Sequence, residues 1–182
     1  MQDLFKIGGY IMKKIILIIS LILSFTTLSF AQEKIKKTYY DTGELFCEIT
    51  LKNNIYNGPF TCYYKNGALE KKGIFINGKT EGKREIYYET GEILQTDTYK
   101  NDKLDGITQI YYKNGALNQK VVFKNGKREG PMKYYNQDGS LWAIINYKND
   151  EIINAECSSG RKWNDAEIHN WSKGLSVSCN QK

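Results

Sequence analysis

One spacing dominates the 182-residue chain: glycines recur every 24 residues over most of its length. One series is Gly43, Gly67, Gly91, Gly115 and Gly139, and a second is Gly58, Gly82, Gly106 and Gly130. The heptad YYKNGAL occurs at residues 63–69 and again at 111–117. A fixed period without insertions is typical of one structural unit stacked along an axis.

Each repeat contains two strand-like segments and two turns. A column of asparagines, each followed by Asn, Gly or Asp, starts at Asn53 and keeps the same period as far as Asn149. Such pairs tolerate the positive φ of tight hairpin turns, and the segments between them are rich in aromatic and β-branched residues. Short connections make neighbouring strands antiparallel. The sequence therefore predicts an all-β fold, an elongated single-layer antiparallel meander of about five hairpin repeats over residues 32–154.

Two tyrosine columns follow the same period. The first is Tyr39, Tyr63, Tyr87, Tyr111 and Tyr135, and the second runs one residue behind it, from Tyr40 to Tyr112. Because side chains alternate along a strand, the two columns face opposite ways. Cys62 shares the side of Tyr64, which predicts the packed face. The first column is the candidate binding ladder for a protein or sugar surface, or for a quaternary ammonium group; the alternative is that its rings only stabilise a thin sheet.

The pattern Y-Y-x-N-G-x-L followed by Y/F-x-N-G-K-x-x-G resembles the bacterial variant of the MORN repeat, in five copies over about residues 39–154. This resemblance implies stacked hairpins, no catalytic activity and a role as scaffold or interaction surface, with some members proposed to touch phospholipid. Some bacterial members are labelled antitoxin components, a role that conflicts with an export signal.

The N-terminal 31 residues are typical of a secretory signal peptide. Lys13 and Lys14 precede an apolar run from Ile15 to Phe30, and Ser29 and Ala31 provide small residues at a cleavage site. The alternative is an uncleaved anchor, although 16 residues are short for a span. Met12 directly precedes the two lysines and is an alternative translation start, in which case Met1–Ile11 is an artefact of a misassigned start. Removing residues 1–31 takes away three lysines and one aspartate, so the net charge falls from +6 to +4.

Export would place the four cysteines in an oxidising compartment, where disulfides persist. Of the three possible connectivities we favour Cys47–Cys62, which flank one turn, and Cys157–Cys179, which bracket the C-terminal tail. Each would stabilise one end of the sheet.

The tail, residues 155–182, leaves the repeat pattern and is predicted to form a cap. Asn164 and Glu167 fit a capping box, and Trp163 with Ile168 fits a hydrophobic staple. We expect a short helix near residues 165–173 and a strand-like LSVSC segment at 175–179, which together cover the last open edge of the sheet.

Catalytic patterns are not evident in the sequence. His169 is the sole histidine and lies in the cap, and the glycines sit at hairpin turns rather than before a helix. We expect no enzymatic activity, cofactor, metal or nucleic-acid partner. Lys79, Lys103 and Lys127 stack along one edge, with Glu81, Asp105 and Glu129 two residues away. We interpret these charges as keeping the edge soluble and protected from pairing with other chains; the alternative is a strip that binds an anionic lipid or a glycan.

Two functions remain open. The first is a non-catalytic exported scaffold that binds another protein through its tyrosine-rich faces. The alternative is a cell-envelope module for a glycan, choline or a phospholipid headgroup, in the periplasm, on the outer surface or secreted. Sugar-binding hairpin repeats normally use tryptophan, and Trp142 is the one tryptophan within these repeats.

Overall fold

The computed structural model describes Lys14 and residues 32–179. The predicted signal peptide and the predicted start at Met12 therefore fall outside the described residues, apart from Lys14. The chain divides into two units, Met1–Gln32 and Glu33–Lys182, and the second contains every strand described below.

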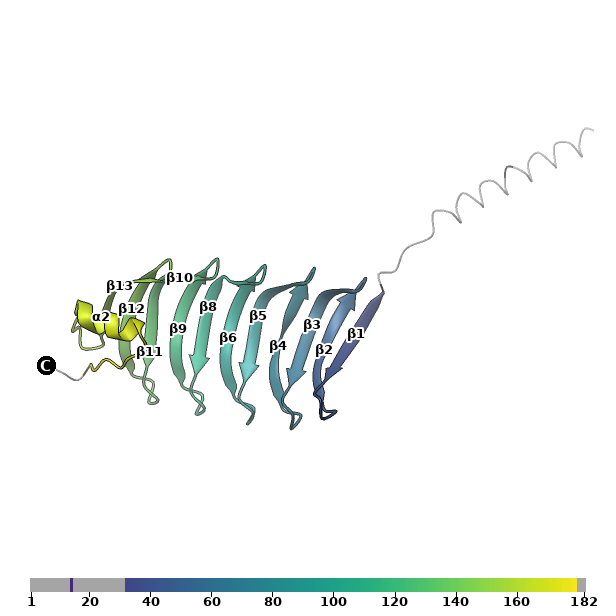
Figure 1. Ribbon diagram of the computed structural model, residues 1–182, viewed down its shortest axis with the longest axis horizontal. Helices are drawn as coiled ribbons and strands as arrows, with labels where there is room; N and C mark the ends of the chain where they lie inside the picture. Colours follow the sequence, from purple (N-terminus) through teal and green to yellow (C-terminus); the bar gives the residue numbers. More distant parts are fainter. Residues whose placement is uncertain (1–13, 15–31, 180–182) are drawn as a thin grey trace, which may run out of the picture. The chain divides into compact units, whose positions relative to one another are not determined.

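The second unit is one antiparallel sheet of thirteen strands followed by a short helix (Figure 1). Strands follow chain order across the sheet, with β7 and β10 as short additions beside β6 and β9. The elements are β1 Glu33–Tyr39, β2 Leu45–Lys52, β3 Ile55–Tyr63, β4 Leu69–Ile76, β5 Lys79–Tyr87, β6 Ile93–Lys100, β7 Lys103–Leu104, β8 Gly106–Tyr111, β9 Leu117–Lys124, β10 Lys127–Arg128, β11 Gly130–Tyr135, β12 Leu141–Lys148, β13 Glu151–Cys157 and α2 Asp165–Ser172. The predicted single-layer meander of hairpins is confirmed.

Two kinds of corner join the strands, and each kind occupies one edge of the sheet (Figure 1). At the Asn-turn edge, Asn77 (φ 49°) and Gly78 (φ 81°) exemplify the two successive positive-φ residues of a tight hairpin turn. At the other edge, longer loops close with a bond from the Tyr64 N–H to the Ala68 carbonyl (2.8 Å). The glycines of both predicted series all have positive φ.

The Asn turns are bonded to one another in a row, and the bonding alternates. Gly78 N–H donates to the Tyr56 carbonyl at 2.7 Å, and Gly126 repeats this bond two turns later. In the intervening turn Asp102 N–H donates to the Thr80 carbonyl (3.1 Å), while the Asp102 carboxylate accepts from the Thr80 N–H (2.6 Å). Asp150 repeats that pair of bonds with Arg128. Turns of two kinds therefore alternate along the edge.

The second glycine series alternates with the same two-repeat period. A Cβ added at Gly58 would lie 2.8 Å from the Thr50 side chain, and one at Gly106 would lie 2.8 Å from Thr98. Gly82 and Gly130 also have positive φ, but a Cβ there would meet nothing within 4 Å. At Gly58 and Gly106 the close threonine side chain leaves no room for a Cβ. At Gly82 and Gly130 only the backbone conformation favours glycine.

The sheet has an inner face, which carries Cys47, Phe60 and Cys62, and an outer face, which carries Thr61 and the Tyr63 column. Buried apolar side chains form two clusters. The smaller lies at the N-terminal end, where Cys47 and Cys62 are cross-strand partners joined by a disulfide (Cα–Cα 4.0 Å). The larger lies under the C-terminal cap and is centred on Ala143 and Ile145, which are fully buried.

Between the two clusters the inner face is polar. Asp97, 1% exposed, accepts two hydrogen bonds from the Arg84 guanidinium (2.6 and 3.1 Å), one from Gln95 (2.7 Å) and one from Thr108 (3.0 Å). Arg84 also lies over the Tyr99 ring, 4.6 Å from its centroid. The four hydrogen bonds that Asp97 accepts satisfy its buried carboxylate, as a buried charge requires.

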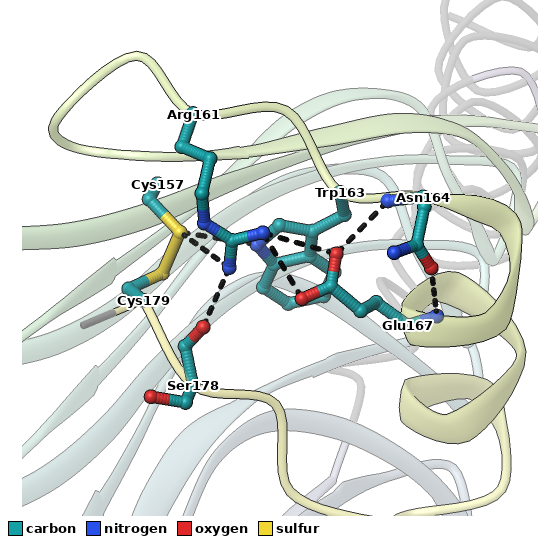
Figure 2. Close-up of polar contacts among 7 residues, drawn as sticks. All are labelled: Cys157, Arg161, Trp163, Asn164, Glu167, Ser178 and Cys179. Atoms are coloured by element: carbon teal, nitrogen blue, oxygen red, sulfur yellow. Dashed lines mark hydrogen bonds and ion pairs between the residues drawn. A yellow bond between two sulfur atoms is a disulfide. The ribbon is translucent and has the colours of Figure 1, made fainter. Parts of the chain in front are cut away.

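The cap is built around Arg161, which joins three segments (Figure 2). Its Nη1 donates to both carboxylate oxygens of Glu167 (3.0 and 3.1 Å), and its Nη2 donates to the Ser178 carbonyl. The capping box at Asn164 and the helix over Asp165–Ser172 are as predicted. The second disulfide, Cys157–Cys179, lies beside this arginine.

The predicted strand at residues 175–179 is wrong. This segment has no strand conformation, because Val177 packs into the C-terminal cluster while Cys179 and the Ser178 carbonyl are held by Cys157 and Arg161. The edge of β13 is instead met by residues 161–163, where the Trp163 N–H donates to the Ala155 carbonyl (2.9 Å). Helix α2 and its Trp171 pack with Tyr134 and Trp142.

Candidate binding face

The two tyrosine columns have different surroundings. In the second column the phenol hydroxyl donates to the backbone carbonyl of the first-column tyrosine in the next repeat, at 2.6–2.8 Å. The donor and acceptor pairs are Tyr40–Tyr63, Tyr64–Tyr87, Tyr88–Tyr111 and Tyr112–Tyr135. These hydroxyls join successive repeats along the loop edge, so the second column is structural.

We call the first column, Tyr39, Tyr63, Tyr87, Tyr111 and Tyr135, the tyrosine ladder. It lies on the outer face, with Tyr39 59% exposed and the other four half-buried. Within residues 32–179, the hydroxyls of Tyr39, Tyr111 and Tyr135 have no hydrogen-bond partner. The ladder thus keeps polar groups available that the second column has already used.

An ionic cluster lies beside the ladder in the middle of the outer face. The Glu85 carboxylate binds Lys83 (2.6 Å), Lys72 (3.0 Å) and the Tyr87 hydroxyl (2.9 Å). Hydrogen bonds from Lys83 and then from Lys72 lower the pKa of Glu85 to about 2. Hydrogen bonding with Tyr87 and then with Glu85 raises the pKa of Lys72. Glu85 therefore stays charged at any physiological pH and orients Tyr87.

Sequence reasoning did not identify this cluster. Glu85 is the cross-strand partner of Lys72, so a register drawn from the repeat period could have placed the two side chains together. The third member, Lys83, lies two residues before Glu85 on the same face.

Two pairs of apolar side chains lie on the outer face, nearer the Asn turns than the ladder, and the Lys83–Thr98 pair separates them. Pro59 is paired with Ile74, and Ile107 is paired with Val122. Ile74 is 46% exposed and Ile107 is 43% exposed. A shallow hollow of about 280 Å³ lies between Pro59, Ile74 and the Glu85 cluster. The outer face therefore combines aromatic, ionic and small apolar patches.

Among the described residues, no group of three or more His, Cys, Asp or Glu side chains is placed to hold a metal ion. The structure also has no helix, within the part of the chain it describes, with the length and apolar character to cross a membrane.

The comparisons with known proteins agree with the repeat geometry. The family model described as MORN repeat variant matches residues 32–53, 56–77, 80–101, 104–125 and 128–149, more than half of the chain. A search of curated proteins found no significant match. MORN repeats form a non-enzymatic family and are generally modules that bind proteins or membranes. With five consecutive matched segments, the chain belongs to the MORN repeat variant family.

Proposed function

We propose that this protein is an exported, non-catalytic scaffold that binds another protein through the tyrosine ladder and the outer face around it. The observation that carries the proposal is the contrast between the two columns. One has every hydroxyl bonded to backbone, whereas in the other Tyr39, Tyr111 and Tyr135 keep free hydroxyls on an exposed face.

The chemistry of the outer face suits a protein partner. Tyrosine gives large rigid contact area at low entropic cost together with a polar tip, which is why it is enriched in protein-binding surfaces. The neighbouring Glu85 cluster adds charge, and Ile74 and Ile107 add apolar area. Helix α2 packs on the inner face with Tyr134, so it leaves the ladder uncovered.

Export is supported by the cysteines. All four form disulfides, Cys47–Cys62 and Cys157–Cys179, and such bonds persist in oxidising compartments. The predicted signal peptide agrees with this proposal, which N-terminal sequencing of the protein recovered from culture medium and from cell envelopes would test. An N-terminus at Gln32 is the expected result, and an intact N-terminus on cytoplasmic protein would contradict it.

The binding test compares the two columns. The full chain is immobilised and exposed to envelope proteins of the source organism, and each captured protein is purified and titrated by calorimetry. A ladder variant with Tyr39→Ala, Tyr111→Ala and Tyr135→Ala should lose at least about tenfold in affinity, as aromatic anchors at interfaces do.

The matched control changes the second column. Tyr40→Phe, Tyr64→Phe and Tyr112→Phe remove the hydroxyls that join repeats, so thermal stability should fall while affinity for the partner is kept. Equal affinity of the ladder variant and the unmodified chain would rule out the ladder as the binding site for the partner. Saturable binding of glycans or of lipid vesicles, lost in the ladder variant, would assign the face to an envelope ligand instead.

A further inference from the structure

Six lysines lie in a row along the Asn-turn edge of the outer face. All six are exposed, and none of their ammonium groups has a hydrogen bond or ion pair with another described residue. We call them the lysine row: Lys79, Lys100, Lys103, Lys124, Lys127 and Lys148. Arg84 and Arg128 do not belong to it, because they stack on Tyr99 and Tyr147 on the inner face.

Two carboxylates of this edge, those of Glu81 and Glu129, are directed at the backbone rather than at the lysines. Glu81 accepts a hydrogen bond from the Asn101 N–H (2.8 Å), and Glu129 accepts one from the Asn149 N–H (3.1 Å). The shorter Asp105 occupies the corresponding position between them. Two of the three carboxylates that the sequence places beside the lysines therefore stabilise the turns, and none of the six lysine ammonium groups forms an ion pair within the described residues.

The arrangement also works against stability. Lys100 is the direct cross-strand partner of Lys103, and Lys124 is the direct partner of Lys127. Like charges directly opposite each other destabilise a hairpin. The last turn pairs Lys148 with Glu151, so an opposite-charge pair fits the same position. The rule against like charges at opposite cross-strand positions is therefore broken in two successive hairpins, and such exceptions are typical of a surface kept for binding.

A polar hollow of about 330 Å³ lies between two successive turns within the row. It is lined by Lys124, Asn125, Lys127, Glu129 and Asn149. Ammonium, amide and carboxylate groups supply donors and acceptors for the hydroxyls of one sugar ring, and the ammonium groups suit its acidic substituent. The same edge repeats about every 10 Å along the sheet, because one repeat adds two strands.

From the unpaired lysines, the linear row and the polar hollow, we propose that the lysine row binds a linear acidic polysaccharide laid along the turns. A polymer with an anionic group on each sugar matches a row of cations that runs along the Asn-turn edge on the outer face of the sheet. The turn tips between Lys79 and Lys148 are Asn, Gly and Asp, which offer no apolar side chain for insertion into a bilayer.

The test uses the full chain, an oligogalacturonate long enough to span the row, and heparin as a sulfated chain. The row variant carries Lys100→Gln, Lys103→Gln, Lys124→Gln and Lys127→Gln. The control variant loses the same charge elsewhere, through Lys65→Gln, Lys113→Gln, Lys162→Gln and Lys173→Gln. Affinity is measured by calorimetry at several salt concentrations, beside thermal melting of each protein.

We expect the unmodified chain to bind at least one of the two acidic chains, with affinity that falls as salt rises. The row variant should lose about tenfold or more, because exposed ion pairs are individually weak and act together, and it should melt no lower than the unmodified chain. The control variant should bind as the unmodified chain does. The ladder variant should also bind normally, which separates this inference from the proposed function.

Three results would overturn the inference. The first is absence of binding to both acidic chains at low salt. A second is an equal loss in the row and control variants, which would mean that net charge alone attracts the polymer. The third is row-dependent binding of phosphatidylglycerol vesicles without binding of either soluble chain, which would assign the row to a membrane surface.

Discussion

The middle of the inner face and its C-terminal end use the same pair of cross-strand positions differently. The middle holds Arg84 and Asp97, whereas 48 residues further along the chain the pair is Met132 and Ile145. Under the cap, Trp163 and Trp171 pack over the sheet against Trp142 of β12, so apolar residues are buried fully. No second layer covers the middle in the described part of the chain, and there Arg84, Gln95 and Thr108 enclose a carboxylate. The repeat determines the backbone, and the covering layer determines which side chains are stable on it.

The largest expected effect tests the middle. Asp97→Ala removes the buried carboxylate that accepts hydrogen bonds from Arg84, Gln95 and Thr108, so the free energy of unfolding should fall by about 3–5 kcal/mol. Urea unfolding followed by circular dichroism measures it. The double variant Arg84→Met, Asp97→Ile copies the C-terminal pair and should recover only part of the loss, because no second layer of the described chain covers these positions in the middle of the sheet. A cost below about 1 kcal/mol for Asp97→Ala would show that the middle does not depend on the ion pair.

The two disulfides test the ends. Cys157→Ser with Cys179→Ser should lower the unfolding free energy by about 3 kcal/mol, and Cys47→Ser with Cys62→Ser by a similar amount. Their spectra should differ, because the Trp163 Nε1 lies 3.3 Å from the Cys157 sulfur and the tryptophans pack together in the cap. Tryptophan fluorescence of the folded protein should change in the first variant alone. A change in the second would mean that the ends are coupled through the middle.

Two glycines of one series differ in whether they have a close neighbour. Gly106→Ala introduces a Cβ 2.8 Å from Thr98 at φ 136°, while Gly130→Ala introduces one in open space at φ 76°. Both variants should be destabilised, and Gly106→Ala should cost about 1–3 kcal/mol more. Thermal unfolding of the two variants measures this difference. Equal melting temperatures would show that Thr98 moves aside at no cost.

The smallest effect is a pH dependence confined to the middle. Glu85 has a folded-state pKa of about 2, against 4.5 for an ordinary glutamate. Its ion pairs therefore stabilise the fold above pH 4.5 and lose their effect as the pH falls toward 2. Glu85→Gln should reduce stability at pH 6 by about 1 kcal/mol or less and have no effect near pH 2. Glu33→Gln is the control, and a pH-independent cost of Glu85→Gln would contradict the assignment.

Much of the fold could be predicted from the sequence because each local signal agrees with the period. The Asn turns, the antiparallel order, the helix after Asn164 and the favoured cysteine pairing all appear in the structure. The polar middle could not be predicted from spacing, since Asp97 occupies a column otherwise held by Ile49, Gly73, Val121 and Ile145. The segment at 175–179 has a strand-like composition, but the disulfide and Arg161 determine its path.

The candidate site was predicted in part. The sequence separates the two tyrosine columns by face, but it does not show that the second column donates to backbone carbonyls 23 residues away. Nor does it show that Glu81 and Glu129 bind turn N–H groups, which is why the lysine edge looks neutral in the sequence and is unpaired in the structure. Both facts depend on distances between repeats, which residue types alone do not define.

The alternation between Gly78 and Asp102 turns, with the matching alternation between Gly58 and Gly82, has a consequence for engineered length. Deleting or inserting a single repeat would place two Asn turns of the same kind next to each other. The hydrogen bonds between a Gly78-type turn and an Asp102-type turn would then be lost at that junction. Adding or removing copies in pairs preserves every junction. Versions of this molecule that differ by an even number of hairpin repeats should therefore assemble as well as the original, while odd-numbered versions should melt at the altered joint.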